Sequence, residues 1–279
     1  MATSSASAKR EFKLSSPSNH IVENLQTPQR FSDYACDIFV QLPSRKSVKK
    51  AIKNSSLLLN GQKAQTGTFV KNGDQLTYSP PVPIRPKKVF ELDFEVVFQD
   101  DHFAVVNKPA GIPVSGNSFR TLMNALPQKL TKSSEPDALA FPKTVHRLDA
   151  ATSGLLVSAK TAKANIHHSR QFEQRTIVKE YCAIVQGTPG EKGQVTSPID
   201  GLEALTNFSI VSVCPSLQNS SLAQLSVFPK TGRTHQIRKH LASIGHPIVG
   251  DSIYGAEGNI LKGKGLFLCA VGLEFLHPN

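Results

Sequence analysis

The stretch from His146 to Val157 reads HRLDAATSGLLV and decides both the fold and the expected site of this chain. Its TSG triplet is typical of a turn, and the apolar run LLV that follows is typical of a buried strand. Asp149 therefore lies in a loop that leads directly into a core strand, which holds its carboxylate rigidly. The neighbouring Arg147 can keep that carboxylate ionised, because a nearby cation lowers a carboxyl pKa by ~1–3 units. An Arg-Asp pair can equally be a surface ion pair, so the surrounding sequence has to decide.

The charge of the chain is unevenly distributed along its 279 residues. The formal net charge is +11, and residues 1–90 contain 14 Lys and Arg against 5 Asp and Glu. The remaining residues contain 18 Lys and Arg against 16 Asp and Glu, which leaves them nearly neutral. A basic module followed by a nearly neutral one indicates an anionic partner, with nucleic acid as the first candidate.

Several classes of protein do not fit the composition. No apolar run reaches the ~18 residues that a membrane span needs, and no secretory segment is present. The cysteines form no CxxC pair and have no metal-ligand spacing, which favours a reduced, cytoplasmic protein without a metal site. They are Cys36, Cys182, Cys214 and Cys269.

Composition and turn signals predict four segments. Residues 1–30 lack hydrophobic periodicity and are expected to be a flexible lead-in, although their Ser/Ala-rich start also allows a transit peptide. Residues 31–80 alternate short apolar runs with Asn-Gly turn signals, which indicates a compact small domain. The proline-rich residues 81–90 are expected to be a linker. Residues 91–279 then form the larger domain.

The small domain contains a short basic helix ahead of its strands. The segments SRKSVKKAIKNSSLLLNG and VKNGDQLTY resemble the S4-like RNA-binding domain. In that family the basic helix and the following turn lie against RNA phosphates. The resemblance implies an RNA-binding role for five cations, Arg45, Lys46, Lys49, Lys50 and Lys53. A generic small basic domain is the alternative.

The larger domain is predicted to alternate strands and helices. We expect helices at 121–126, 161–175 and 234–243, and strands at 94–98, 103–106, 155–157, 178–185, 194–199, 208–213 and 222–227. The segment KTGRTHQIRKHLASIGHPIVGDSIYG, residues 230–255, has histidines that invite a metal site. His235 and His240 are five residues apart, about 140° around a helix, so they do not share a face as zinc ligands would.

Residues 90–278 resemble the RluA-type pseudouridine synthases in several segments. The central stretch is similar to the family signature HRLDxxTSGLL, and residues 230–255 are similar to GRTHQIRxHLxxxGxPIxGDxxYG. VVNKPAG and KEYCAIVQG also match family segments, and LFLCAVGLEFLHP matches the closing strand with Cys269 in place of the usual histidine. The resemblance implies an α/β (α+β) fold around a mixed, largely antiparallel central sheet, with an active cleft across its middle.

The resemblance also implies the roles of individual residues. Asp149 corresponds to the catalytic aspartate, Arg238 to its ion-pair partner, and Tyr181 to the tyrosine that packs on the target base. Four further residues would contact substrate: Arg147, which helps to fill the place of the extruded base, Ile237 at the pocket border, Arg233 near a phosphate, and His146.

The implied reaction is the isomerisation of uridine to pseudouridine in RNA. It breaks a C–N glycosidic bond and rejoins the base through carbon 5, so no redox or energy cofactor is required. An ionised carboxylate is needed beside the nucleotide. Asp149 could add to the ring, attack the sugar or deprotonate the sugar, and the residue types are compatible with all three.

Two other classes of function are alternatives to the synthase. A non-catalytic RNA-binding or ribosome-assembly protein would explain the basic small domain but not the presence of both Asp149 and Arg238. A hydrolase using Ser153 would need a GxSxG elbow and a base, and neither surrounds that residue. We therefore expect a monomeric synthase acting on ribosomal RNA or, failing that, transfer RNA.

Overall fold

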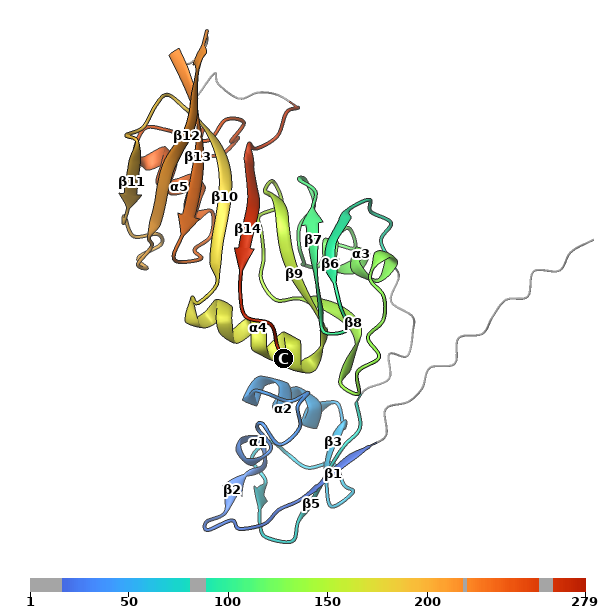
Figure 1. Cartoon of the computed structure of the whole chain (residues 1–279). Helices are drawn as coiled ribbons and strands as arrows, with labels where there is room; N and C mark the ends of the chain where they lie inside the picture. Colours follow the sequence, from blue (N-terminus) through green and yellow to red (C-terminus); the bar gives the residue numbers. More distant parts are fainter. Residues whose placement is uncertain (1–16, 81–88, 218–219, 256–262) are drawn as a thin grey trace, which may run out of the picture. The chain divides into compact units, whose positions relative to one another are not determined.

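The chain divides into two compact units, the first ending at residue 87 and the second beginning at residue 88. Figure 1 draws the first unit in blue to cyan and the second from green to red. The computed structural model describes residues 17–80, 89–217, 220–255 and 263–279. The linker expected at 81–90 lies almost wholly outside these residues. None of the described helices is long and apolar enough to cross a membrane.

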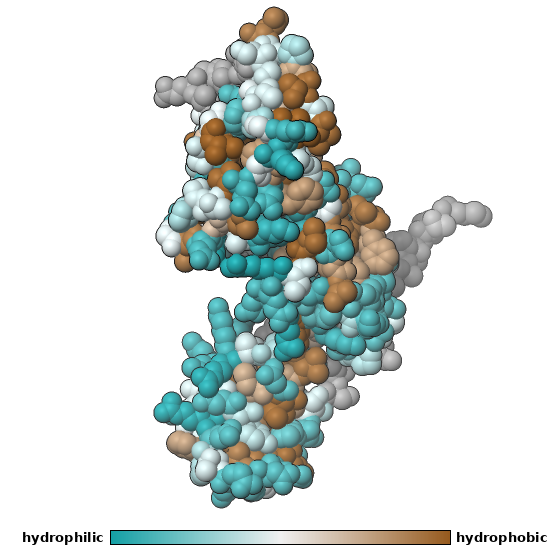
Figure 2. Space-filling view, turned by 60° about the vertical axis from the view of Figure 1, so that its left-hand side comes forward, coloured by the Kyte–Doolittle hydropathy of each residue, from teal (hydrophilic) through white to brown (hydrophobic). Residues whose placement is uncertain are grey.

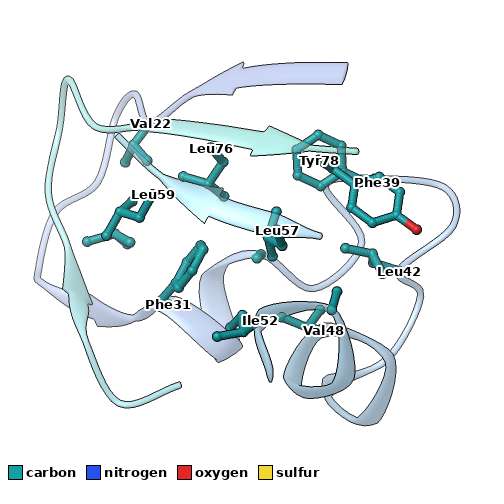
Figure 3. Packing of buried hydrophobic residues seen from close by; sticks show 13 residues of the cluster. Val22, Phe31, Phe39, Leu42, Val48, Ile52, Leu57, Leu59, Leu76 and Tyr78 are labelled. Atoms are coloured by element: carbon teal, nitrogen blue, oxygen red, sulfur yellow. The ribbon is translucent and has the colours of Figure 1, made fainter. Parts of the chain in front are cut away.

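The small unit packs two helices against two small sheets. Its helices are α1 (Phe31–Tyr34) and α2 (Arg45–Lys53), and its strands are β1 (Ser18–Ile21), β2 (Gln29–Arg30), β3 (Leu57–Leu59), β4 (Phe69–Val70) and β5 (Gln75–Tyr78). One sheet has the order β1-β5-β3, and β2 pairs with β4 in the other. Figure 3 shows Val48 and Ile52 of α2 facing Leu57 of β3 in the core of this unit.

Helix α2 is amphipathic and well capped. The side chain of Ser44 accepts a hydrogen bond from the backbone N–H of Ser47, and the Ser47 hydroxyl accepts one from the N–H of Ser44. This reciprocal pair satisfies two N–H groups that a helix start would otherwise leave unpaired. The buried residues of the helix share one face, and its five cations are exposed. The buried residues are Val48, Ala51 and Ile52.

The expectation of a flexible segment over residues 1–30 is wrong for its second half. Strand β1 pairs antiparallel with β5, and Val22, which follows β1, is fully buried in the core of the small unit. One buried valine in a polar stretch produces no periodicity, so the sequence pattern could not reveal this strand. Residues 1–16 lie outside the described part of the chain.

The second unit is built on one large sheet. Its strands are β6 (Glu95–Gln99), β7 (Phe103–Lys108), β8 (Ala138–Thr144), β9 (Ser153–Thr161), β10 (Val178–Gln186), β11 (Lys192–Val195), β12 (Thr206–Ser216), β13 (Ser220–Pro229) and β14 (Leu268–Glu274). Its helices are α3 (Leu122–Lys129), α4 (Ala162–Gln174) and α5 (Gln236–Ser243).

Strand order in this sheet is β11-β12-β13-β10-β14-β9-β7-β6, with β8 also paired to β9. Every pairing is antiparallel except that of β14 with β9, so the expected mixed, largely antiparallel sheet is confirmed. Figure 1 shows β14 running between β10 and β9. The β14–β9 ladder has only two residue pairs, so a short junction joins the two halves of the sheet.

Glycine at position 154 makes this junction possible. Gly154 has φ +112°, and a Cβ atom built on it would lie 2.2 Å from the carbonyl oxygen of Ala270 on β14. Any other residue would push the two strands apart. The expectation that the TSG triplet forms a turn is corrected: the turn spans residues 149–152, and Ser153 and Gly154 begin β9, where Gly154 lets β14 approach.

Most predicted elements are present, with shifts at their ends. Helix α4 begins after the N-cap Thr161, whose hydroxyl accepts from the N–H of Ala164, and ends at Arg175 in the left-handed conformation. Strand β11 lies a few residues before its predicted position at 194–199, and β8 was not predicted. The hairpin of β12 and β13 extends beyond its predicted ends. Figure 2 shows hydrophobic residues at the tip of this hairpin, at the top of the view.

Helix α4 carries a buried histidine that should make the fold sensitive to acid. His168 is fully buried; its Nδ1 lies 3.0 Å from the carbonyl oxygen of Ala164, and its ring contacts Phe103 and Phe275. Its Nε2 has no hydrogen-bond partner among the described residues. Burial, reinforced by the nearby His167 and His277, lowers the pKa of His168 to about 4.

The sign of this linkage predicts acid destabilisation. Below pH ~6.5 His168 becomes protonated in the unfolded chain but stays neutral in the folded protein. The free energy of unfolding therefore falls until the pH reaches the folded pKa of about 4. Because glutamine does not titrate, we expect the Tm of His168→Gln to fall less between pH 7 and pH 4.5 than the Tm of the parent protein. Thermal unfolding across that range checks this, and parallel curves for the two proteins would contradict it.

Candidate active site

Hydrogen bonds and the entry into β9 hold the loop that carries Asp149. Downstream it enters β9, and the N–H of Thr152 donates to the carbonyl oxygen of Asp149 at 3.1 Å. From the end of β7, the fully buried Lys108 donates from Nζ to three carbonyl oxygens, those of Pro109, Ile112 and, in the Asp149 loop itself, Ala150. Burial lowers the pKa of Lys108 to about 8, against the opposing effect of Asp149. Lys108 thus ties the end of β7 to the loop.

Asp149 is held between two groups from the third motif. Its Oδ2 lies 3.8 Å from Nη1 of Arg238 and 3.8 Å from Nε2 of His235. Among the described residues these are the ion-pair partners of Asp149, whereas Arg147 is exposed and forms no such pair with it. The prediction that Arg238 pairs with Asp149 agrees with this geometry. The expectation that Arg147 is the cation beside Asp149 is corrected, because the Arg238 guanidinium lies at ion-pair distance from the carboxylate and the His235 ring lies equally near.

Arg238 has a second and closer carboxylate partner, which the sequence did not identify. Its Nε and Nη2 donate to Oδ2 and Oδ1 of Asp251 at 2.7 and 2.6 Å, a bidentate pair in which both side chains are buried. Burial opposes ionisation of Asp251, but the bonds from Arg238 and from the N–H groups of Ile253 and Tyr254 outweigh it and hold its pKa below the usual range. Asp251 therefore fixes the guanidinium, and Nη1 is left to face Asp149.

Helix α5 begins one turn before Arg238, at a strained residue. His235 is its N-cap and has φ +56°, a backbone conformation that residues other than glycine rarely adopt. Its Nδ1 forms a 3.0 Å hydrogen bond with the Tyr254 hydroxyl, and the Arg238 guanidinium lies over the Tyr254 ring at 5.1 Å. Tyr254 thus braces both groups that contact Asp149, and strain of this kind is typical of functional sites.

Tyr181 of β10 faces the same cavity as Asp149. The cavity has a volume of about 480 Å³ and is lined by residues of the central stretch, of β10 and of the third motif. Burial, with a smaller contribution from Asp149, raises the pKa of Tyr181 to about 12, so the phenol stays neutral at physiological pH. A neutral ring beside an ionic pair offers a stacking surface and one hydrogen-bond donor.

The other predicted substrate contacts also line this cavity. Ile237 is 6% exposed and belongs to the core that supports the cavity wall. Arg233 is half-buried and donates from Nε to the carbonyl oxygen of Glu203 at 3.0 Å, while Arg147 is exposed. The predicted site residues Asp149, Tyr181 and Arg238 thus line one cavity together with these side chains. Their roles toward substrate stay predictions.

His146 lines the cavity but is also engaged by the protein. Its Nε2 accepts a hydrogen bond from the N–H of Val157 at 3.0 Å, and its ring stacks on Phe172 with centroids 4.3 Å apart. Burial first, then the charge of Lys179, lowers the pKa of His146 to about 3, so the ring is neutral. This geometry makes His146 a brace between the Asp149 loop and β9.

The arrangement suits a reaction on an uncharged group of the substrate, in which an anionic side chain lies beside the reacting atoms. One carboxylate faces a cavity, a buried arginine and a histidine hold it, and a neutral aromatic ring lies nearby. Among the described residues no three His, Cys, Asp or Glu side chains gather to hold a metal ion.

Comparisons with known proteins give matches over most of the chain. The family model described as RNA pseudouridylate synthase matches residues 102–243. The ribosomal large subunit pseudouridine synthase D of Zymomonas mobilis is 36% identical over 267 residues, covering 84% of this chain and 82% of that protein. Synthase C of Vibrio parahaemolyticus is 31% identical over 283 residues, covering 90% and 86%.

Solved structures show the same fold. The human RNA pseudouridylate synthase domain containing 1 matches with a TM-score of 0.55 and 24% identity, covering 65% of this chain and 78% of that one. The human protein named RNA pseudouridylate synthase domain containing 4 matches with a TM-score of 0.52 and 25% identity, covering 64% of this chain and 82% of that one.

Proposed function

The chain belongs to the RNA pseudouridylate synthase family and is an RNA pseudouridine synthase, and from this premise we propose that it modifies uridines of large-subunit ribosomal RNA. The observation that carries the proposed site is the position of Asp149. Its carboxylate faces a cavity of about 480 Å³, within ion-pair distance of Arg238 and beside the ring of Tyr181. Related synthases C and D are named for the large ribosomal subunit, which supports the choice of RNA.

In the proposed mechanism the protein supplies charge, position and a neutral aromatic surface. Asp149 acts as the carboxylate beside the ribose and the uracil, and Arg238, whose Nη1 lies 3.8 Å from it, holds it in position. Tyr181 stacks on the target base after it leaves the RNA stack, an extrusion that costs a few kcal/mol. Arg147 is exposed and lines the cavity, which supports the proposal that it helps to fill the vacated position.

The small unit is proposed to provide electrostatic attraction to RNA as an S4-like domain. The exposed cations Arg45, Lys46, Lys49, Lys50 and Lys53 all lie on α2, and the buried face of that helix anchors it to the core. Since Asp149, Tyr181 and Arg238 come from one chain, we expect a monomer to suffice. The four free cysteines fit the cytoplasmic location expected from the sequence.

Removing charge from α2 should weaken RNA binding and reduce its salt dependence. We expect Lys49→Gln with Lys53→Gln to lower the log–log salt slope by about 1.4, since each phosphate contact to a single strand contributes roughly 0.7. Turnover at saturating RNA should not change. The matched control is Lys63→Gln with Lys71→Gln, which removes two exposed charges elsewhere on the same unit. Equal slopes for the two double variants would mean that α2 does not contact RNA phosphates.

The proposed substrate is tested by mapping pseudouridine in cells with and without this gene. We expect one or a few pseudouridines to disappear from large-subunit ribosomal RNA and to return with the wild-type gene but not with Asp149→Asn. Loss of sites from transfer RNA instead would show that the ribosomal substrate is wrong while the activity is right.

A further inference from the structure

Two cysteines lie directly opposite each other on neighbouring strands of the central sheet. Cys182 of β10 and Cys269 of β14 are partners in the antiparallel ladder, so their side chains project from the same face. Both are half-buried and both are free thiols. Tyr181 and Ala270, the next pair in the ladder, project from the opposite face, where they contact the hydrophobic core.

The ladder places the two thiols within reach of a covalent bond. Directly opposite residues of antiparallel strands have Cα atoms about 4.5–5.5 Å apart, inside the range of about 4.4–6.8 Å that disulfides span. Within the described part of the chain each sulfur has one weak hydrogen bond: Gln224 donates to Cys182 Sγ at 3.5 Å, and Cys269 Sγ lies 3.8 Å from the oxygen of Ala270. We propose that Cys182 and Cys269 are a modification site that takes a reversible disulfide.

The other two cysteines lack this arrangement. Cys214 is exposed on β12, opposite Leu222 of β13. Cys36 belongs to the small unit, where burial raises the pKa of its thiol and so reduces its reactive thiolate. The pair on β10 and β14 is thus the one place in the described ladders where two thiols are matched in register.

Oxidised glutathione is a sufficient oxidant for the step. One cysteine thiolate attacks a glutathione sulfur, forms a mixed disulfide and releases one reduced glutathione. The second cysteine thiolate then attacks the protein sulfur of that mixed disulfide and releases the other reduced glutathione. Two protein thiols lose their protons, two glutathione thiols gain them, and one disulfide is exchanged for another.

The bond should reduce turnover, a consequence that rests on the proposed function. Cys182 follows Tyr181, and Cys269 is paired with Ser153 in the short junction of β14 with β9. A disulfide needs Cβ atoms about 3.8 Å apart, closer than the about 4.5–5.5 Å of opposite residues. The strands that carry Tyr181 and lead from Asp149 would therefore shift relative to one another, and a shift of about 1 Å can cost ~10²-fold in rate.

The test uses the full-length protein equilibrated with oxidised or reduced glutathione. Peptide mapping without reduction should recover the peptides of Cys182 and Cys269 as one disulfide-linked species, and two of the four thiols should become unavailable to a thiol reagent. Turnover should fall at least tenfold and return on reduction. Cys182→Ser and Cys269→Ser should keep their turnover in oxidised glutathione, while Cys36→Ser and Cys214→Ser should behave as the wild type.

The outcomes separate the parts of this inference. Absence of the linked peptides from the oxidised wild type would overturn the disulfide site, and mapping on the wild type does not depend on any variant folding. Linked peptides with unchanged turnover would overturn the effect on the active site. If the reduced wild type has no synthase activity, the proposed function fails, while peptide mapping still decides whether the disulfide forms.

Discussion

Asp149→Asn is expected to abolish pseudouridine formation, with a loss of turnover on the order of 10³-fold or more, because the amide keeps the size of the side chain but removes its charge. The fold should be intact, since the loop is held by the buried Lys108 and by the junction at Gly154 rather than by the carboxylate. RNA affinity should be equal or slightly tighter, because one negative charge beside the phosphates is removed. Single-turnover assays and RNA binding, measured on the same preparation, check these expectations.

A suitable control is Asp200→Asn. Asp200 has an exposed side chain and pairs with Lys239, so it shares the chemistry of the change but not the cavity. Its turnover should match the wild type. Residual turnover of Asp149→Asn within about tenfold of the wild type would contradict the assigned role.

The second large effect is expected from breaking the buried pair of Arg238 and Asp251. Arg238→Met leaves a buried carboxylate without its cation, and Asp251→Asn leaves a buried guanidinium without its anion. Each should lower the free energy of unfolding by about 3 kcal/mol, as is usual when one partner of a buried pair is removed. Each should also reduce turnover by ~10²-fold or more, because Nη1 of Arg238 no longer holds Asp149 in place.

The double variant separates stability from catalysis. Combining Arg238→Met with Asp251→Asn removes both buried charges, so the double variant should be less destabilised than the sum of the singles by more than about 1 kcal/mol. Its turnover should stay as low as that of Arg238→Met, since Asp149 still lacks its cation. Recovery of turnover together with stability would mean that the pair has only a structural role.

The arrangement of these charges explains why a single arginine serves two carboxylates. Asp251 uses Nε and Nη2 and is buried completely, whereas Asp149 faces Nη1 and is 21% exposed to the cavity. Asp251 fixes the orientation of the guanidinium plane, and Asp149 lies beside the remaining nitrogen, Nη1. The planar guanidinium permits this division, which a lysine could not provide.

Much of the fold could be predicted because the signals were local. Thr161 caps α4, Ser44 and Ser47 cap α2, and the Asn60-Gly61 turn has positive φ at both residues, as the turn signal required. Strand β1 gave no such signal. It is held by pairing with β5 across more than fifty residues of sequence, and only the adjacent Val22 is buried.

Site residues that belong to the family motifs were predicted. Residues whose role depends on a long-range contact were missed. Asp149, Tyr181 and Arg238 were placed together by resemblance. Asp251 stood in the quoted segment, in the sequence GDSIYG, but nothing in its spacing showed that its loop returns to Arg238. Lys108 lies in the segment VVNKPAG, and no role was predicted for it, since a buried lysine with three carbonyl acceptors cannot be distinguished from an exposed one by sequence alone.

The central claim is that Asp149, held by Arg238, isomerises uridine in large-subunit ribosomal RNA. Formation of the new bond at carbon 5 displaces the hydrogen at that position, so tritium at carbon 5 of uridine reports the reaction directly. Purified wild-type protein should release tritium from labelled large-subunit ribosomal RNA up to a plateau that matches its target sites, and Asp149→Asn should release none. Wild-type protein that binds this RNA tightly yet releases no tritium would contradict the account.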